Sequence, residues 1–410
     1  MTGEEKLREF SEESFRKTIT EVNERIYHFL GYGHSNCTAV RGSSSWILID
    51  ALDTDKRAER MYAELRKICD LPVSAIIFTH GHPDHRGGSG AFACMSPEVI
   101  AFAPVKKPLP YYDRLNDVLN ARTVRQFGYD ETDEEAITQG IGPREGHTQN
   151  DGVYSFLPPT TVYAEETVSR VIDGVPMELT RAPGETDDTV LVWLPEDKVI
   201  CTGDNYYGTF PNLYAIRGTQ YRDIAQWIAS LRKILTYPAE ALLPGHTAPL
   251  IGRELIQKQV GTFTDAIEAL LEDTLACMNR GMTLSETAQT VTLRDEYRDL
   301  PYLGEFYGTA EWAVKSIYTG YLGWFDGSPA KLMPLPEGEF NRELHALIGE
   351  EKLQERIHAA IAQEKYQLAL QLLEIADDKT CLKEALLGRA SQMTSANGRH
   401  YLISSANEHK

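Results

Sequence analysis

The first half of the chain alternates short apolar runs with polar turns. After a charged segment over residues 1–25, which we expect to be helical, three apolar runs are separated by Gly and Ser turns, a pattern typical of consecutive β-strands. These runs cover residues 25–29, 37–40 and 45–50. Residues 53–69 then carry apolar side chains at helical spacing, and a further apolar run follows at 73–78. This order predicts the opening of an αββα sandwich, in which two sheets face each other between helical layers.

Further along, the pattern weakens and then changes its period. We expect a helix over residues 111–127, a solvated acidic run at 130–136 and a glycine-rich loop at 140–152. Strand patterns return in four segments, at residues 161–164, 168–172, 177–180 and 190–194. From residue 254 onward the apolar positions recur at helical spacing almost throughout. The chain is therefore expected to hold two domains, a sandwich over residues 1–255 and a helical domain over residues 256–410.

Composition narrows the class of protein. The 410 residues are 42% hydrophobic and 25% charged, as in soluble globular enzymes. The formal net charge of −19 argues against a nucleic-acid partner and an anionic membrane surface, so an anionic substrate needs a local basic patch. Six scattered cysteines, none at C-x-x-C spacing, indicate free thiols in a reducing compartment. With no apolar core in the first 16 residues and no apolar run that spans a bilayer, we expect a cytoplasmic protein without a membrane span.

One polar stretch directly follows the apolar run at 73–78. Its sequence is Thr79-His80-Gly81-His82-Pro83-Asp84-His85, which places three imidazoles and one carboxylate within six residues. A tight turn there aims His80 and His82 to one side and Asp84 and His85 to the other, the geometry that two adjacent cations need. Imidazole and carboxylate are ligands that zinc prefers, although a polar turn with unrelated histidines is the alternative. The pattern H-x-H-x-D-H resembles the signature of the metallo-β-lactamase superfamily at every position.

Three further candidate ligands each follow a strand pattern. They are Glu185 in Ala-Pro-Gly-Glu-Thr, Asp204 in Cys-Thr-Gly-Asp-Asn and His246 in Leu-Pro-Gly-His. Superfamily members carry a P-G-H-T, a G-D and a late P-G-H segment in this order, and the chain is similar at all three, with Glu185 in place of the first histidine. A polar residue at the end of a strand is the alternative for each of the three.

The resemblance implies a complete set of ligands for two cations. One cation would be bound by His80, His82 and Glu185, and the other by Asp84, His85 and His246, with Asp204 bridging the two. The three carboxylates, Asp84, Glu185 and Asp204, are expected to be catalytic residues as well as ligands. The cofactors expected are two Zn²⁺ ions, with Mn²⁺ or Fe²⁺ as alternatives. Two close cations share a hydroxide and polarise the substrate oxygen, so the reaction class is metal-assisted hydrolysis.

Glu185 and two longer motifs resemble the alkylsulfatase family within this superfamily. The run from Asn212 to Asp223 is similar to the family's N-L-x-x-x-R-G-x-x-x-R-D, and residues 321–329, Y-L-G-W-F-D-G-S-P, resemble the end of its helical dimerisation domain. The resemblance implies an α/β fold class, with an αββα metallo-β-lactamase sandwich followed by an all-α dimerisation domain, and a homodimer. Four residues would bind the substrate: Asn212, Arg217, Arg222 and Tyr307. Arginine suits a sulfate group because its planar donors bind two oxygens at once.

The function expected from the sequence is hydrolysis of organic (alkyl) sulfate esters at a dinuclear metal site. The substrate would then be a small organic anion. Two alternatives stay open at this point: hydrolysis of another ester, such as a phosphodiester or a lactone, and a metal-dependent scaffold protein that binds a partner through its helices. His147, a lone histidine in the glycine-rich loop, is not expected to be a ligand.

Overall fold

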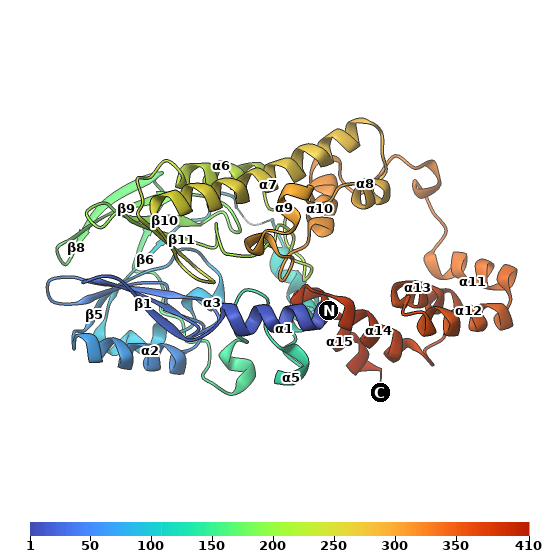
Figure 1. The fold of residues 1–410 in the computed structure, drawn as a ribbon, viewed down its shortest axis with the longest axis horizontal. Coiled ribbons are helices and arrows are strands. Elements are labelled where there is room, and N and C mark those ends of the chain that lie inside the picture. Colours follow the sequence, from blue (N-terminus) through green and yellow to red (C-terminus); the bar gives the residue numbers. More distant parts are fainter. Residues whose placement is uncertain (108, 410) are drawn as a thin grey trace.

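Two mixed β-sheets form the N-terminal part of the protein in the computed structural model, which describes residues 1–107 and 109–409 (Figure 1). The first sheet holds seven strands in chain order: β1 (Thr18–Asn23), β2 (Ile26–Leu30), β3 (Cys37–Arg41), β4 (Trp46–Ile49), β5 (Val73–Ile77), β6 (Glu98–Phe102) and β7 (Thr161–Tyr163). β1 to β4 are antiparallel, whereas β4, β5, β6 and β7 run parallel to one another. Crossover connections such as α2 (Asp55–Ile68) and the segment after β5 make this parallel part possible.

The second sheet has the spatial order β13-β12-β11-β10-β9-β8. Its strands are β8 (Thr167–Ile172), β9 (Val175–Arg181), β10 (Val190–Leu194), β11 (Val199–Gly203), β12 (Ala241–Pro244) and β13 (Leu250–Ile251). β11 and β12 pair in parallel, with Cys201 opposite Leu243 and Gly203 opposite Pro244. The loops after these two strands therefore leave the sheet at the same edge, which brings Asp204 and His246 together.

The main core lies between the two sheets. Alternate residues of both sheets point into it, for example Ile47 and Ile49 of β4 and Val190 and Val192 of β10. The outer face of the first sheet packs against Ala58, the rest of the apolar stripe of α2 and η1 (Ser89–Met95). The outer face of the second sheet is covered by α6 (Ile224–Ile234) and α7 (Arg253–Asn279) (Figure 1). The predicted αββα sandwich is confirmed.

The N-terminal segment differs from its prediction. The helix α1 covers only Gly3–Ser14, and residues 18–23 form the edge strand β1 rather than the end of a helix. Four of the six residues in Thr-Ile-Thr-Glu-Val-Asn are β-branched, which favours a strand over a helix. The prediction of a helix to residue 25 was wrong. Charged residues occur both in α1 and in residues 16–25, so the charge pattern does not show where the helix ends.

The acidic run at 130–136 also differs from its prediction, since part of it is buried. Glu131 is only 6% exposed, near α5 (Asp133–Ala136), and accepts a hydrogen bond from Ser404. Burial raises the pKa of Glu131 to about 8, although Arg399 and Ser404 oppose this shift. The run was expected to be solvated because a sequence pattern does not show that the C-terminal helix packs over it.

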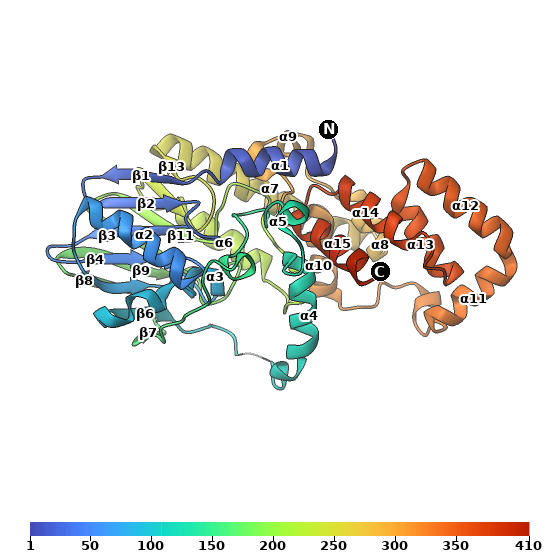
Figure 2. The same cartoon turned by 90° about the horizontal axis from the view of Figure 1, so that it is seen from below.

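The C-terminal part is helical, as predicted, and forms two packing regions. α11 (Glu337–Ile348), α12 (Glu350–Ala362) and α13 (Tyr366–Ala376) lie at the end of the molecule remote from the sheets (Figures 1 and 2). α14 (Leu382–Gln392) lies between these helices and the last helix, and α12 to α14 share a core with Leu353 and Leu373. The last helix, α15 (Ala396–Glu408), returns to pack against α4 (Asn116–Phe127). His400 of α15 bonds the carbonyls of Gln126 and Ala136, which ties the helical part to the loops around the site.

The remaining helices connect these two parts. They are α8 (Leu284–Thr290), α9 (Asp295–Arg298) and α10 (Ala310–Leu322). α7 begins at Arg253, close to the predicted division at residue 255, but its apolar face belongs to the core of the second sheet. The division of the chain into residues 1–255 and 256–410 therefore stays a prediction. Residues of α10 such as Val314 and Ile317 join the same core.

All six cysteines are free thiols, and Cys37 and Cys201 are buried near the centre of the sandwich. Over residues 1–107 and 109–409, no helix combines the length and the apolar character needed to cross a bilayer.

Candidate metal centre and active site

The motif loop connects β5 to the short helix α3 (Pro83–Arg86). Pro83 occupies the first turn of α3, so His80 and His82 precede the helix while Asp84 and His85 lie inside it. Gly81 packs against the Asp188 carboxylate, where an added Cβ would lie 2.8 Å from Oδ2. The ring centroids of His80 and His85 are 4.3 Å apart, closer than those of His80 and His82 at 4.7 Å, so the division of the four side chains between two cations stays a prediction.

Asp204, directly after β11, lies at the centre of the side-chain cluster. Its Oδ2 is 3.6 Å from Nε2 of His80 and 3.4 Å from Nε2 of His246, and its Oδ1 is 3.3 Å from Nε2 of His85. Nε2 of His80 and Oδ1 of Asp204 are buried and make no hydrogen bond within the described part of the chain. Buried polar atoms without a partner indicate a ligand that the structure does not contain.

The potential ligand atoms in the described residues form three groups, two of which share Asp204, while the third consists of His34, Asp84 and His246. His80, His82 and Asp204 make the first group and His85, Asp204 and His246 the second, with all ligand atoms in a group within 4.8 Å of one another. Asp84 joins the second group, with Oδ2 3.3 Å from Nε2 of His246. Nitrogen and carboxylate donors at these distances are compatible with a metal site.

The ring orientations of the second group are set by hydrogen bonds outside it. Nδ1 of His85 lies 2.7 Å from Oδ2 of Asp50, which also accepts from Thr79. Nδ1 of His246 donates to the backbone carbonyl of His34 at 3.0 Å. Both bonds leave Nε2 directed at the cluster, the usual arrangement for a metal-binding imidazole. Asp50 was not among the predicted residues, although an aspartate directly after an apolar strand is a signal that was available.

The carboxylates make the cluster attractive for positive charge. Burial alone lowers the pKa of His246, but the adjacent Asp204 carboxylate raises this pKa to about 9. Burial likewise opposes ionisation of Asp204, yet His246 and His85 hold its pKa well below the usual range. The negative charge of the carboxylates that favours a proton on His246 also favours a divalent cation bound to its nitrogen.

Glu185 lies in the loop between β9 and β10 and is paired with an arginine. Its Oε1 is 2.8 Å from Nη1 of Arg222, and its Oε2 is 3.3 Å from the hydroxyl of Tyr207. Glu185 does not belong to the groups of ligand atoms within 4.8 Å found in the described residues. Burial raises its pKa, Arg222 lowers it, and Asp204 raises it further. Its role as a ligand of the first cation stays a prediction.

The four predicted substrate residues line one cavity next to the cluster. The cavity has a volume of about 280 Å³, and Asn212, Arg217, Arg222 and Tyr307 share it with His82, Asp84, Glu185 and Asp204. Nε of Arg222 and both polar side-chain atoms of Asn212 are buried without a hydrogen-bond partner in the part of the chain described. These atoms can bind a polar ligand at no loss of existing contacts.

A second cavity of about 460 Å³ adjoins the first and shares Arg217 and Arg222 with it. Lys106 and Lys107 line its wall, so four basic residues surround the approach to the cluster. Glu185, Asp187 and Asp223 line the same cavity, and Lys106 and Arg222 are paired with Asp223 and Glu185, so Lys107 and Arg217 are the basic residues that can bind an anionic substrate there.

Among the cavity residues that were not predicted, His34 and Glu145 have titratable side chains that lie near the cluster. Glu145 accepts hydrogen bonds from the hydroxyls of Tyr129 and Tyr154, and burial with the nearby Asp84 raises its pKa to about 8. His147 is adjacent to Glu145, and the distance from Nδ1 of His147 to Oε2 of Glu145 is 3.3 Å. Neither His34 nor Glu145 belongs to a motif of fixed spacing, so sequence reasoning had no signal for them.

The sandwich matches the family model described as metallo-beta-lactamase superfamily over residues 30–246, more than half of the chain. The protein belongs to the metallo-β-lactamase superfamily. Residues 283–410 match the model described as alkyl sulfatase dimerisation. The predicted resemblance to a metallo-β-lactamase sandwich with an alkylsulfatase-type helical domain is confirmed.

Several superfamily members are similar over most of the chain. A linear primary-alkylsulfatase from Pseudomonas sp. (strain ATCC 19151) is 33% identical over 314 residues, which cover 74% of this chain and 58% of the relative. An alkyl/aryl-sulfatase, BDS1, from Saccharomyces cerevisiae is 29% identical over 332 residues, which cover 78% of this chain and 51% of the relative. The chain thus spans about half the length of the curated relatives it matches.

A solved structure shows the same fold. A double mutant of the sec-alkyl sulfatase PisA1 superposes with a TM-score of 0.86 at 23% identity, over 98% of this chain and 67% of that one. The arrangement of sandwich and helical domain is therefore shared with a known alkylsulfatase structure.

Proposed function

We propose that the protein is a dinuclear metal-dependent hydrolase that cleaves organic (alkyl) sulfate esters. The observation that carries the proposal is the position of the two ligand groups around Asp204, next to a cavity whose wall holds Arg217, Arg222 and Asn212. Curated relatives named as alkylsulfatases support the substrate class.

In this proposal, separate residues bind the cations, the sulfate group and the organic portion of the substrate. The His80 and His85 groups would hold two divalent cations, which would supply Lewis-acid activation of water and of the substrate oxygen. Arg217 and Arg222 bind the non-bridging sulfate oxygens, and Asn212 and Tyr307 add neutral donors. The organic portion lies against the apolar cavity residues Phe127, Ile141 and Ala215. The ion would be Zn²⁺, with Mn²⁺ or Fe²⁺ as alternatives, and the predicted cytoplasmic location stays a prediction.

Purified protein is expected to release sulfate from dodecyl sulfate, and Arg217→Ala is expected to raise KM about 10- to 100-fold. A charge-assisted hydrogen bond contributes roughly 1.5–3 kcal/mol, and Arg217 has no part in the ion pairs around Asp204. Sulfate release is measured on samples whose metal content is determined in parallel. Arg114→Ala, in the neighbouring loop but outside both cavities, is the control and should keep the wild-type KM.

A panel of alkyl sulfates that all fail to react, with two cations bound per chain, would contradict the sulfatase proposal. The same protein sample would then be tested with phosphodiesters and lactones, the alternative substrates. An unchanged KM in Arg217→Ala would instead remove Arg217 from the sulfate site.

A homodimer is proposed on the basis of the match to the dimerisation model and of apolar side chains at the end of α10. Tyr321, Leu322 and Trp324 are exposed, Trp324 by 72%. Exposed apolar residues so close together are typical of a protein interface. Light scattering at micromolar concentration should give twice the 46.0 kDa chain mass, and a monomeric mass would contradict the proposal.

A further inference from the structure

We propose that His34, in the loop between β2 and β3, is an additional ligand of the cation held by Asp84, His85, Asp204 and His246. The inference rests on the proposed function only in that it requires a cation at this position. It assigns a protein ligand outside the motifs from which the metal site was predicted.

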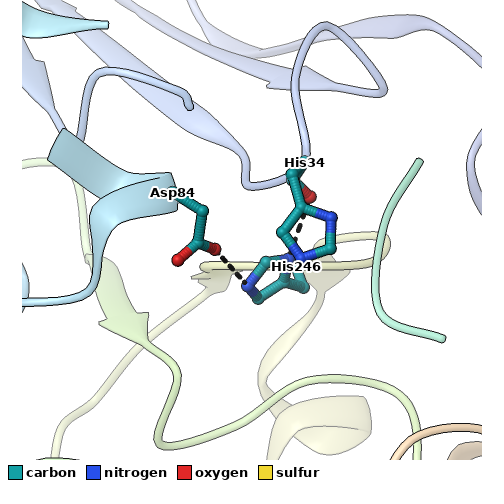
Figure 3. Close-up of side chains that lie close together, drawn as sticks. All are labelled: His34, Asp84 and His246. Carbon is teal, nitrogen blue, oxygen red and sulfur yellow. Dashed lines mark hydrogen bonds and ion pairs between the residues drawn. The ribbon is translucent and has the colours of Figure 1, made fainter. Parts of the chain in front are cut away.

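The His34 ring is placed for metal binding. Its side chain is buried, and Nδ1 lies 2.7 Å from the carbonyl oxygen of Pro143. A carbonyl only accepts, so Nδ1 carries the proton and Nε2 keeps a free lone pair. His34, Asp84 and His246 each offer a ligand atom within 4.8 Å of the other two. Figure 3 shows the His34 ring above that of His246, with the Asp84 carboxylate directed at the same space.

The backbone around His34 is fixed by contacts that do not involve the ring. The N–H of His34 donates to Oδ1 of Asp53 at 3.0 Å, and its carbonyl accepts from Nδ1 of His246. Asp53 is in turn paired with Arg57 at 3.1 Å. At Gly142 an added Cβ would lie 2.0 Å from the His34 carbonyl oxygen, so the two loops approach as closely as glycine allows. A residue held this firmly orients its imidazole at little entropic cost on binding.

His246 links His34 to the predicted second site. Its Nδ1 is bonded to the His34 carbonyl, so Nε2 is the atom available in both groups that contain His246. No group of ligand atoms within 4.8 Å of one another in the described residues contains His34 together with His85 or Asp204. A cation bound by Nε2 of His246 therefore has to draw the two groups together for His34 to become a fifth protein ligand beside Asp84, His85, Asp204 and His246. Catalytic zinc usually has three protein ligands plus water, whereas Mn²⁺ and Fe²⁺ accept six ligands. His34 should thus shift this site toward six-coordinate ions.

The test measures metal binding rather than turnover. Chelator-treated protein is titrated with Mn²⁺ and with Zn²⁺ by calorimetry, and bound metal per chain is measured directly. His34→Leu and His34→Gln are expected to weaken binding of one of the two cations on the order of 10- to 100-fold, more for Mn²⁺ than for Zn²⁺. His147→Leu, which removes a histidine of the neighbouring loop, should bind both cations as the wild type does. Unchanged affinities in both His34 variants would overturn the proposal.

A second measurement needs no variant. In wild-type protein labelled with nitrogen-15 histidine and loaded with cadmium-113, each ligating nitrogen couples to the metal. Five coupled histidines of the 11 in the chain would support the proposal, and four, without His34, would overturn it. Two bound cations with four coupled histidines would leave the proposed hydrolase intact, whereas five coupled histidines without sulfate release would contradict only the proposed substrate.

Discussion

Asp204→Ala is expected to lower sulfate release by about 10³-fold or more and to reduce bound metal below two ions per chain. The carboxylate lies within 3.6 Å of His80, His85 and His246, and both ligand groups depend on it. A dinuclear site contributes several kcal/mol of transition-state stabilisation, and each 1.36 kcal/mol is a tenfold change in rate. Metal content and steady-state kinetics on the same samples measure the two effects together.

Two further variants show whether the loss belongs to the bridge itself. Asp204→Glu retains the charge, but Gly245 packs so closely that an added Cβ there would lie 2.3 Å from Oδ1 of Asp204. We expect this variant to bind cations and to have a reduced kcat, since the longer side chain has to shift. Asp295→Ala removes an exposed carboxylate and should leave both readouts unchanged. Full metal content with wild-type activity in Asp204→Ala would contradict the bridging role.

The side-chain cluster around Asp204 could be predicted in large part because most of its residues lie in short sequence motifs or at the ends of strands. His80, His82, Asp84 and His85 have a fixed spacing within one turn, so their relative placement needs no knowledge of the rest of the chain. Asp204 and His246 end β11 and β12, and a parallel pair brings two such ends to the same edge of a sheet. The sequence assigned Asp204 and His246 to one site only by resemblance, and the structure adds the parallel pairing of β11 and β12 with its register.

The rest of the site depends on contacts that have no sequence period. His34 and Glu145 come from loops whose apolar pattern is weak, and each is placed by hydrogen bonds to residues far away in the chain. The burial of Glu131 could not be predicted for the same reason. It depends on α15, a helix distant in the sequence, whose Ser404 donates a hydrogen bond to Glu131. Local spacing predicts the elements, whereas the return of a distant helix or loop decides which polar residues become enclosed.

Glu185 and Arg222 show how two separate predictions combine. The sequence assigns Glu185 to a cation and Arg222 to the sulfate, and the structure pairs the two side chains at 2.8 Å in a buried environment. Arg222 also donates to the carbonyl of Asn212, while its Nε remains without a partner in the described residues. One guanidinium can therefore hold Glu185 in place and still offer a donor to the cavity.

Arg222→Ala is expected to destabilise the metal-free protein by about 3–5 kcal/mol, because Glu185 is left buried without its partner. The cost should grow with pH. Burial already raises the pKa of Glu185 and Arg222 lowers it, so without Arg222 the pKa rises further. Below the ordinary pKa of 4.5 both the folded and the unfolded variant hold the proton and the loss is small. The loss then grows with pH up to the raised pKa of the folded state, above which the variant has to bury an unpaired charge. Urea unfolding at pH 5 and pH 8 measures the difference.

The double variant Glu185→Gln/Arg222→Ala separates stability from substrate binding. Removing both charges should restore most of the lost stability at pH 8, since no unpaired carboxylate remains. Arg222→Lys keeps the charge without the two-oxygen geometry, so it should be nearly as stable as the wild type but show a raised KM for dodecyl sulfate. A double variant as unstable as Arg222→Ala alone would show that Arg222 acts through packing against Asn212 rather than through its charge.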